Sequence, residues 1–113
     1  MLKYSHPLEV EGPVDRSSDT AHQLVSDIAR RLLVRVAEGD ADALGSLYDL
    51  TSRAVHRLAL LLTRDAEAAA CLTIRSYERA WAEAATYDAR QASPLVWLLA
   101  FVRAESEDLA PAA

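Results

Sequence analysis

The stretch EGDADALGSLYDLTSRAVHRLALLLTRDAEAA, residues 38–69, decides the fold of this chain. A glycine followed by an aspartate opens it, and a second aspartate, Asp65, stands near its end. Glycine just after a helix supports the turn that ends it, and aspartate caps the helix that follows. The pattern therefore predicts a first helix ending at Gly39, a second over residues 41–64 capped by Asp40, and a third after Asp65. Apolar or aromatic side chains recur at helical spacing along the second helix: Leu44, Leu47, Tyr48, Val55, Leu58 and Leu62.

The flanking segments complete a helical domain. Residues 1–20 hold prolines, a glycine and scattered charges, which predicts a flexible N-terminal arm. The first helix is expected to begin within residues 21–27. TYDARQA, residues 86–92, is a predicted loop, and Ser93 followed by Pro94 is a strong start signal for a last helix. We therefore predict a helical domain over residues 21–110.

The predicted fold class is all-α, a small bundle of about four helices, because no segment shows sustained alternation of apolar and polar residues. The chain has 113 residues and half of them are hydrophobic, enough for one domain with one core. The core is expected to contain Leu47, Tyr48, Leu58, Leu62, Tyr77, Trp81, Leu98 and Val102.

Composition argues against several classes of protein. The net charge of −5 is unusual for a free-standing nucleic-acid binder. The single cysteine, Cys71, excludes an internal disulfide. The longest apolar run, residues 95–102, is too short to span a bilayer, and the N-terminus has no apolar stretch of signal-peptide length. These features predict a soluble, cytoplasmic protein without membrane contact.

Catalytic patterns are absent from the sequence. The histidines His6, His22 and His56 have no cysteine or acid at metal-ligand spacing, so we expect no metal site. The glycines are isolated, and no phosphate-binding loop is present. Cys71 lies in an alanine-rich helix, which favours a small packing or surface residue over a reactive thiol. We predict that the chain is not an enzyme and uses no cofactor.

The order of these signals resembles the second conserved region of the bacterial extracytoplasmic-function sigma factors. AEGDADALGSLYD matches the opening of that region, and LTRDAEAA before a helix ending in YERAW matches its middle. YDARQASPLVWLLAFVR matches its loop and final helix, so the resemblance covers about residues 32–103. The chain ends at Ala113 with no pattern for the family's C-terminal helix-turn-helix domain, which suggests a degenerate family member.

The resemblance implies binding surfaces on two helices. In the family, the third helix docks on the clamp helices of RNA polymerase. The final helix and its preceding loop capture and melt the promoter −10 element. The polymerase- or partner-binding positions would then be Glu67, Cys71, Ile74, Arg75 and Glu78. The positions for DNA would be Tyr87, Trp97 and Arg103, although core packing is the preferred interpretation of Trp97.

Departures from the family pattern argue against full sigma activity. An acid, an amide and a second acid of the family's third helix are replaced by Cys71, Ile74 and Arg75, and Arg75 would meet a basic polymerase surface. Where the family's last helix continues with Arg and Asn residues, this chain has Arg103 and then acids that would repel DNA phosphates: Glu105, Glu107 and Asp108.

Two functions follow from these expectations. The chain is a sigma region 2-like transcription regulator that binds RNA polymerase core and promoter DNA, or it is a degenerate sigma mimic that binds only proteins, such as an anti-sigma factor. The apolar start of the last helix also predicts an exposed patch at Val96, Leu99 and Ala100, rimmed by the acids and suited to self-association or a protein partner. Alternatively, the N-terminal arm covers this patch.

Overall fold

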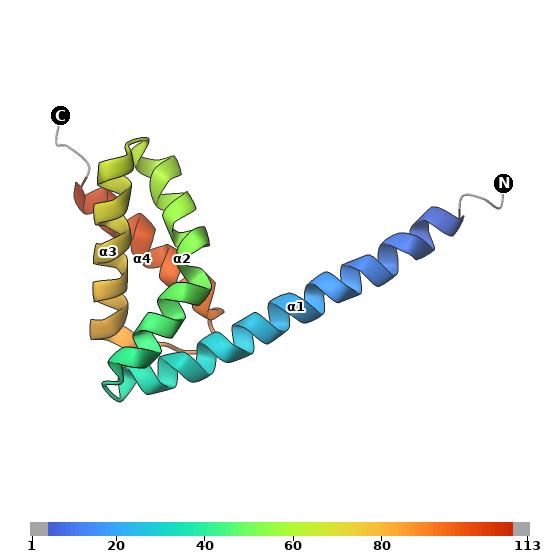
Figure 1. The fold of residues 1–113 in the computed structure, drawn as a ribbon, viewed down its shortest axis with the longest axis horizontal. Coiled ribbons are helices and arrows are strands. Elements are labelled where there is room, and N and C mark those ends of the chain that lie inside the picture. The colour runs from blue at the N-terminus through green and yellow to red at the C-terminus, as the bar shows by residue number, and fades with distance from the viewer. Residues whose placement is uncertain (1–4, 110–113) are drawn as a thin grey trace.

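Four α-helices and one short 3₁₀ turn make up the computed structural model, which describes residues 5–109, with side chains from residue 20 onward. No residue in this range forms a strand, so the predicted all-α class is confirmed. Helices α2 and α3 run antiparallel side by side, α4 crosses behind them, and the N-terminal part of α1 extends away from the other helices (Figure 1). The elements are α1 (Ser5–Ala37), α2 (Ala41–Thr63), α3 (Ala66–Glu83), η2 (Ala84–Thr86) and α4 (Pro94–Leu109).

The predicted caps set the boundaries of the helices. Gly39 has φ +90°, a left-handed conformation that suits glycine after α1. The Asp40 carboxylate accepts hydrogen bonds from the N–H groups of Asp42 and Ala43 at the start of α2. Asp65 accepts from the Ala68 N–H at 2.8 Å in the same way, which starts α3. The sequence signals therefore placed these turns correctly.

The first and last helices differ in how well they were predicted. In α4, the Ser93 Oγ accepts from the Val96 N–H at 3.3 Å, and the helix begins at Pro94, as expected. The first helix begins at Ser5, well before the predicted start within residues 21–27. Residues 1–4 and the side chains of residues 5–19 lie outside the described part, as does Ala110, so the arm and the domain boundaries stay predictions.

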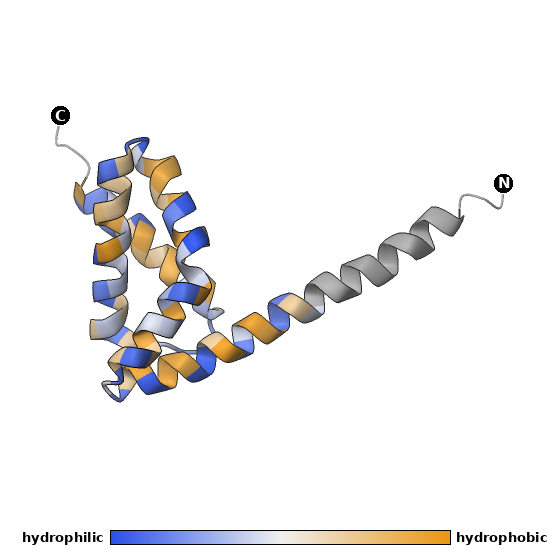
Figure 2. Cartoon of the chain, viewed as in Figure 1, coloured by the Kyte–Doolittle hydropathy of each residue, from blue (hydrophilic) through white to orange (hydrophobic). Residues whose placement is uncertain are grey.

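Small residues at the helix contacts allow close packing of the bundle. The buried stripe of α2 consists of residues spaced by four: Ala43, Leu47, Thr51, Val55 and Ala59. Helices that meet through alanine approach closely, and few side chains are then fully enclosed. Helix α1 joins this core through Ala29, Leu33 and Val36, and its ribbon is largely hydrophobic where it meets the bundle (Figure 2).

The predicted core is correct in part. Leu47, Tyr77, Leu98 and Val102 are buried, and Leu58 packs against the core while partly exposed.

Tyr48, Leu62 and Trp81 were predicted in the core but are exposed, so these predictions were wrong. Tyr48 borders the buried stripe and touches Tyr77 with its ring, the centroids 4.9 Å apart. Leu62 lies in the last turn of α2, and Trp81 lies beside the buried face of α3. The narrow, alanine-rich contacts leave these large side chains at the edges of the core.

Candidate protein interface on helix α3

The residues predicted to bind polymerase or a partner share one face of α3. Ile74 is 58% exposed, and the other four are exposed as well. Their spacing of four, three, one and three residues keeps them within one helical stripe. The opposite side of α3 is buried, so the α3 face points into solvent along its length. The structure thus brings together all five positions, which we name the α3 face: Glu67, Cys71, Ile74, Arg75 and Glu78.

Buried hydroxyls fix the rotation of α3. Tyr77 shares a hydrogen bond with Thr51 of α2, and this contact joins the two helices inside the core. Thr73 and Ser76 are also buried, and each hydroxyl donates to a carbonyl one turn earlier, so neither is left without a partner. Burial raises the pKa of Tyr77 to about 12, which keeps its phenol neutral. With this side of α3 held, the α3 face cannot turn inward.

An ionic bridge connects the α3 face to α4. The Glu105 carboxylate accepts from the Arg75 Nε at 3.1 Å and from the Arg79 Nη1 at 3.2 Å, and its side chain is only 12% exposed. Arg79 also donates to Glu83 at 2.9 Å and lies over the ring of Phe101, 4.8 Å from its centroid. The hydrogen bond to Glu83, followed by that to Glu105, holds the pKa of Arg79 above its usual range.

The bridge corrects one sequence prediction. Glu105 was expected on a solvent rim that repels DNA, but it faces α3 and is paired with two arginines. It follows Leu98 by seven residues, two helical turns, and therefore lies on the buried side of α4. Of the three acids in the last turns of α4, only Glu107 and Asp108 are exposed.

Trp81 lies at the border between the α3 face and the buried side of this helix, although the sequence placed it in the predicted core. It follows Ile74 by seven residues, two helical turns, and is 40% exposed. Trp81 also continues the apolar stripe that contains Tyr77 and Ala80, and for this reason the sequence predicted it in the core. Ile74 and Trp81 place exposed apolar groups beside the acids of the α3 face, and tryptophan is one of the residue types enriched at protein interfaces.

The three positions predicted to meet DNA do not form one surface. The rings of Tyr87 and Trp97 are 5.4 Å apart, and Trp97 also meets Phe101 at 4.6 Å. The Tyr87 hydroxyl donates to the Ala92 carbonyl at 2.8 Å, which closes the loop before α4. Both aromatics are half-buried, in agreement with a packing role for Trp97. Arg103 is exposed six residues later, about a third of a turn around α4 from Trp97.

Known proteins with similar sequences identify the family. The chain is 36% identical over 83 residues to the ECF RNA polymerase sigma factor SigK of Mycobacterium ulcerans, covering 74% of this chain and 44% of that protein. It is 35% identical over 77 residues to the protein of the same name from Mycobacterium sp. strain KMS, covering 68% of this chain and 40% of the relative. These similarities support an extracytoplasmic-function sigma factor region 2-like domain.

The sigma-like domain spans less than half the length of these relatives. No protein-family model matches it, and no solved structure matches it significantly. The family shown by these relatives is the one that the order of sequence motifs predicted. The binding roles of the individual residues remain predictions.

The apolar patch predicted on α4 of the sigma-like domain is smaller than expected. Val96 and Ala100 are exposed, but Leu99 is partly buried and packs against the core. The first turns of α4 are apolar on most sides because α2, α3 and α1 all contact this helix. Two exposed side chains are a normal surface feature rather than a large patch. Coverage of Val96 and Ala100 by the N-terminal arm stays a prediction, because the side chains of the arm lie outside the described residues.

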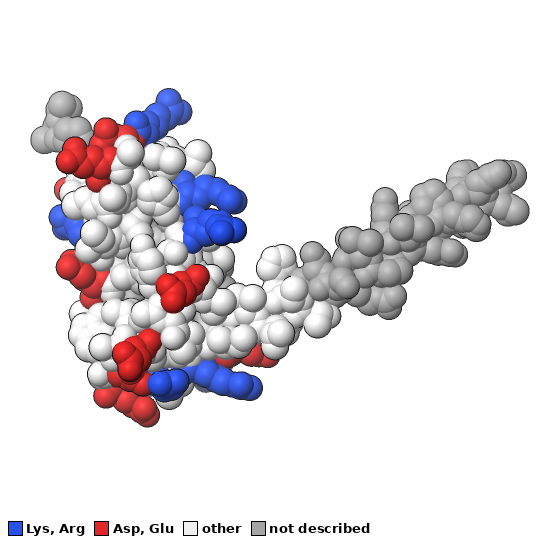
Figure 3. Space-filling view, in the orientation of Figure 1, with Lys and Arg blue, Asp and Glu red and all other residues white. Residues whose placement is uncertain are grey.

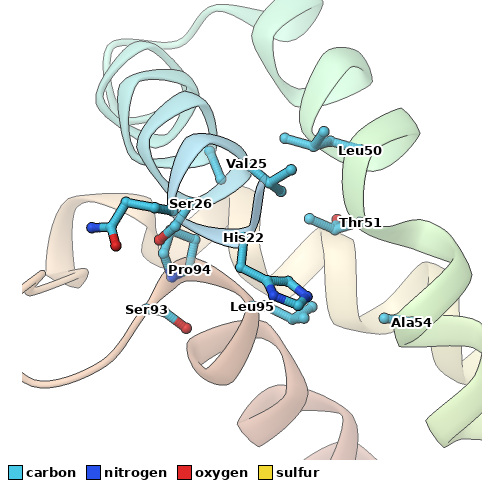
Figure 4. A pocket seen from close by; sticks show the side chains of 11 residues that line it. His22, Val25, Ser26, Leu50, Thr51, Ala54, Ser93, Pro94 and Leu95 are labelled. Atoms are coloured by element: carbon cyan, nitrogen blue, oxygen red, sulfur yellow. The ribbon is translucent and has the colours of Figure 1, made fainter. Parts of the chain in front are cut away.

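A pocket of about 530 Å³ lies where α1, α2 and the start of α4 meet. Figure 4 shows Val25, Leu50 and Leu95 directed into it from three helices, with His22 at its opening. Ala29, Ala54 and Pro94 complete its apolar lining. In the described part of the chain, no cluster of histidine, cysteine and acidic residues is arranged to hold a metal ion. No described helix is long and apolar enough to cross a membrane.

Proposed function

We propose that this chain is a sigma region 2-like transcription regulator that binds the RNA polymerase core through its α3 face. The exposure of all five predicted positions on one side of α3, in a domain related to sigma factors, carries this proposal. Ile74 and Trp81 would supply buried contact area, and Glu67 and Glu78 would meet basic groups of the polymerase. The domain would act in the cytoplasm, where polymerase works, and without catalysis of its own.

The ionic bridge reduces the charge conflict predicted at Arg75. Its guanidinium donates to Glu105 and therefore presents less positive charge to a basic partner than a free arginine would. Glu67 and Glu78 are exposed carboxylates on the same face, and neither forms an ion pair with another described residue. The α3 face therefore keeps an acidic balance despite the arginine.

Binding to purified core polymerase tests the proposal. Glu78→Lys should weaken binding severalfold, because it reverses the charge of an exposed carboxylate on the α3 face. Glu38→Lys is the matched control: Glu38 is also exposed but lies just after α1, away from this face. Equal affinity for wild type and the Glu78 variant, or an equal loss in both variants, would refute binding through α3.

We further propose that the isolated domain binds promoter DNA weakly. Arg103 is exposed on α4, but Glu107 and Asp108 are exposed within the next five residues. A single strand of −10-like sequence should show no measurable shift at physiological salt. A specific, salt-sensitive shift that Arg103→Ala abolishes would contradict this expectation.

The second candidate function is a sigma mimic that binds proteins only, and the acidic end of α4 favours it. Such a protein would occupy an anti-sigma factor and leave a competing sigma factor free. Pull-down with candidate anti-sigma proteins and with core polymerase separates the two functions: capture of an anti-sigma protein without polymerase supports the mimic. Capture of polymerase supports the regulator.

A further inference from the structure

The outer side of α2 carries basic and apolar side chains together. Opposite the buried stripe of this helix, its last turns expose Arg53 and Arg57, and the C-cap residue Arg64 is exposed just after the helix. Leucines lie between Arg57 and Arg64. Figure 3 shows basic side chains gathered on the edge of the bundle beside α2, away from α3. We name this surface the basic α2 face: Arg53, Arg57, Leu60, Leu61 and Arg64.

The charge of this face is not compensated within the described part of the chain. None of Arg53, Arg57 and Arg64 forms an ion pair there, whereas five other arginines do: Arg30, Arg35, Arg75, Arg79 and Arg90. The nearest acid on α2 is Asp49, one turn before Arg53, and no ion pair joins the two. Three unpaired arginines on one side of a chain with net charge −5 indicate a surface suited to an acidic partner.

The leucines decide which kind of acidic partner fits. Leu61 is 67% exposed and Leu60 is 41% exposed, and both lie between arginines. A phosphate backbone gains nothing from exposed leucines, because its contacts are made by charged and hydrogen-bonding groups. A protein helix with carboxylates beside apolar side chains uses both the leucines and the arginines. The mixture of basic and apolar groups therefore favours a protein partner.

The pocket between α1, α2 and α4 continues this surface at one end. Leu50, Thr51 and Ala54 form its wall on α2, and Leu50 and Ala54 each lie three residues before an arginine of the basic α2 face. Residues three apart are neighbours on a helix surface. From Leu50 to Arg64 the surface is about 21 Å long, the length of a helix of four turns. An apolar side chain in the pocket and carboxylates at Arg53 and Arg57 can therefore come from one short helix.

We propose that the basic α2 face binds an amphipathic helix of another protein that carries carboxylates and leucine-like side chains. The arginines pair with the carboxylates, the leucines and the pocket take the apolar side chains, and burial of both makes the contact specific. This surface lies on α2 and does not depend on the polymerase role proposed for α3. The two could be occupied together.

A synthetic helical peptide with glutamates every fourth residue and leucines between them is the probe, and its binding is followed by fluorescence anisotropy. The double variant Arg53→Gln/Arg57→Gln should lose affinity roughly twofold to thirtyfold, which corresponds to about 0.4–2 kcal/mol for the loss of two exposed charge pairs. Leu61→Ser should weaken binding roughly tenfold through lost apolar contact. Arg31→Gln, an exposed arginine of α1 without an ion pair to another described residue, is the matched control and should bind like wild type.

The comparison peptide has glutamine at every glutamate position. Equal binding of both peptides, or equal losses in the α1 and α2 variants, would overturn the proposal. The proposal would also be overturned if the glutamate peptide does not bind at millimolar concentration. Binding of duplex DNA through the same arginines, without binding of the peptide, would overturn it as well. Self-association of the wild type that the arginine substitutions abolish would assign the face to a second copy instead. Circular dichroism of each variant confirms that it is folded.

Discussion

Neutralising Glu105 tests whether the ionic bridge controls both stability and partner binding. Glu105→Gln keeps the shape of the side chain but removes the charge that Arg75 and Arg79 share. The two arginines are 43% and 33% exposed, so solvent screens each pair and each contributes about 0.2–1 kcal/mol. We therefore expect the free energy of unfolding to fall by about 0.5–2 kcal/mol.

Urea denaturation of four proteins isolates the Arg75–Glu105 pair. These are the wild type, Arg75→Gln, Glu105→Gln and the double variant, and the cycle should give a coupling energy of about 0.5–1 kcal/mol. A coupling energy within error of zero would show that the bridge does not contribute in solution. Because a domain of this size shifts its Tm by roughly 4–8 °C per kcal/mol, thermal denaturation provides a second readout.

The same four proteins test the role of Arg75 at the proposed polymerase face. Removing Glu105 frees the Arg75 charge and should weaken binding to core polymerase, whereas Arg75→Gln should strengthen it. The double variant should bind like Arg75→Gln, because the charge that matters is absent from both. If Glu105→Gln binds more tightly than wild type, the electrostatic reasoning about this face is wrong.

The remaining predictions concern the core and its edges. Burial raises the pKa of Tyr77 to about 12, so between about pH 10 and pH 12 the tyrosine ionises in the unfolded chain before it does in the folded domain. The free energy of unfolding should therefore fall over this pH range. Urea titrations of Tyr77→Phe should show a smaller fall, because this variant has no phenol to ionise. Trp81→Ala should cost about 1 kcal/mol or less and Leu72→Ala about 2–5 kcal/mol in thermal denaturation, since only Leu72 is fully enclosed. Leu99→Glu should unfold the domain, whereas Val96→Glu should leave its circular dichroism unchanged.

Local signals in the sequence predicted the helix boundaries well because capping is local chemistry. Asp40, Asp65 and Ser93 each accept a hydrogen bond from an N–H two or three residues away, so a short window of sequence contains both partners. The start of α1 was missed because prolines and a glycine within residues 7–13 indicate a break. The structure continues the helix through them.

Burial of large residues could not be predicted with the same success because it depends on how closely helices approach. Periodicity places Trp81 and Tyr48 near the apolar side of their helices, but it does not give the width of the enclosed stripe. Buried alanines such as Ala59 and Ala80 narrow that stripe, since they bring neighbouring helices together. The positions on α3 came from the family resemblance and not from periodicity, and their binding roles stay predictions.

The two departures from the family pattern are best understood as one feature. Taken separately, an arginine on α3 was predicted to weaken polymerase binding and a glutamate on α4 was predicted to weaken DNA binding. In the folded domain, Arg75 and Glu105 bind each other, so each reduces the charge that the other presents to a partner. Substitutions in contact are not independent, and their effects cannot be added. The acidic end of α4 therefore has two parts: Glu105 pairs with arginines of α3, and Glu107 and Asp108 face solvent, where we expect them to repel DNA phosphates.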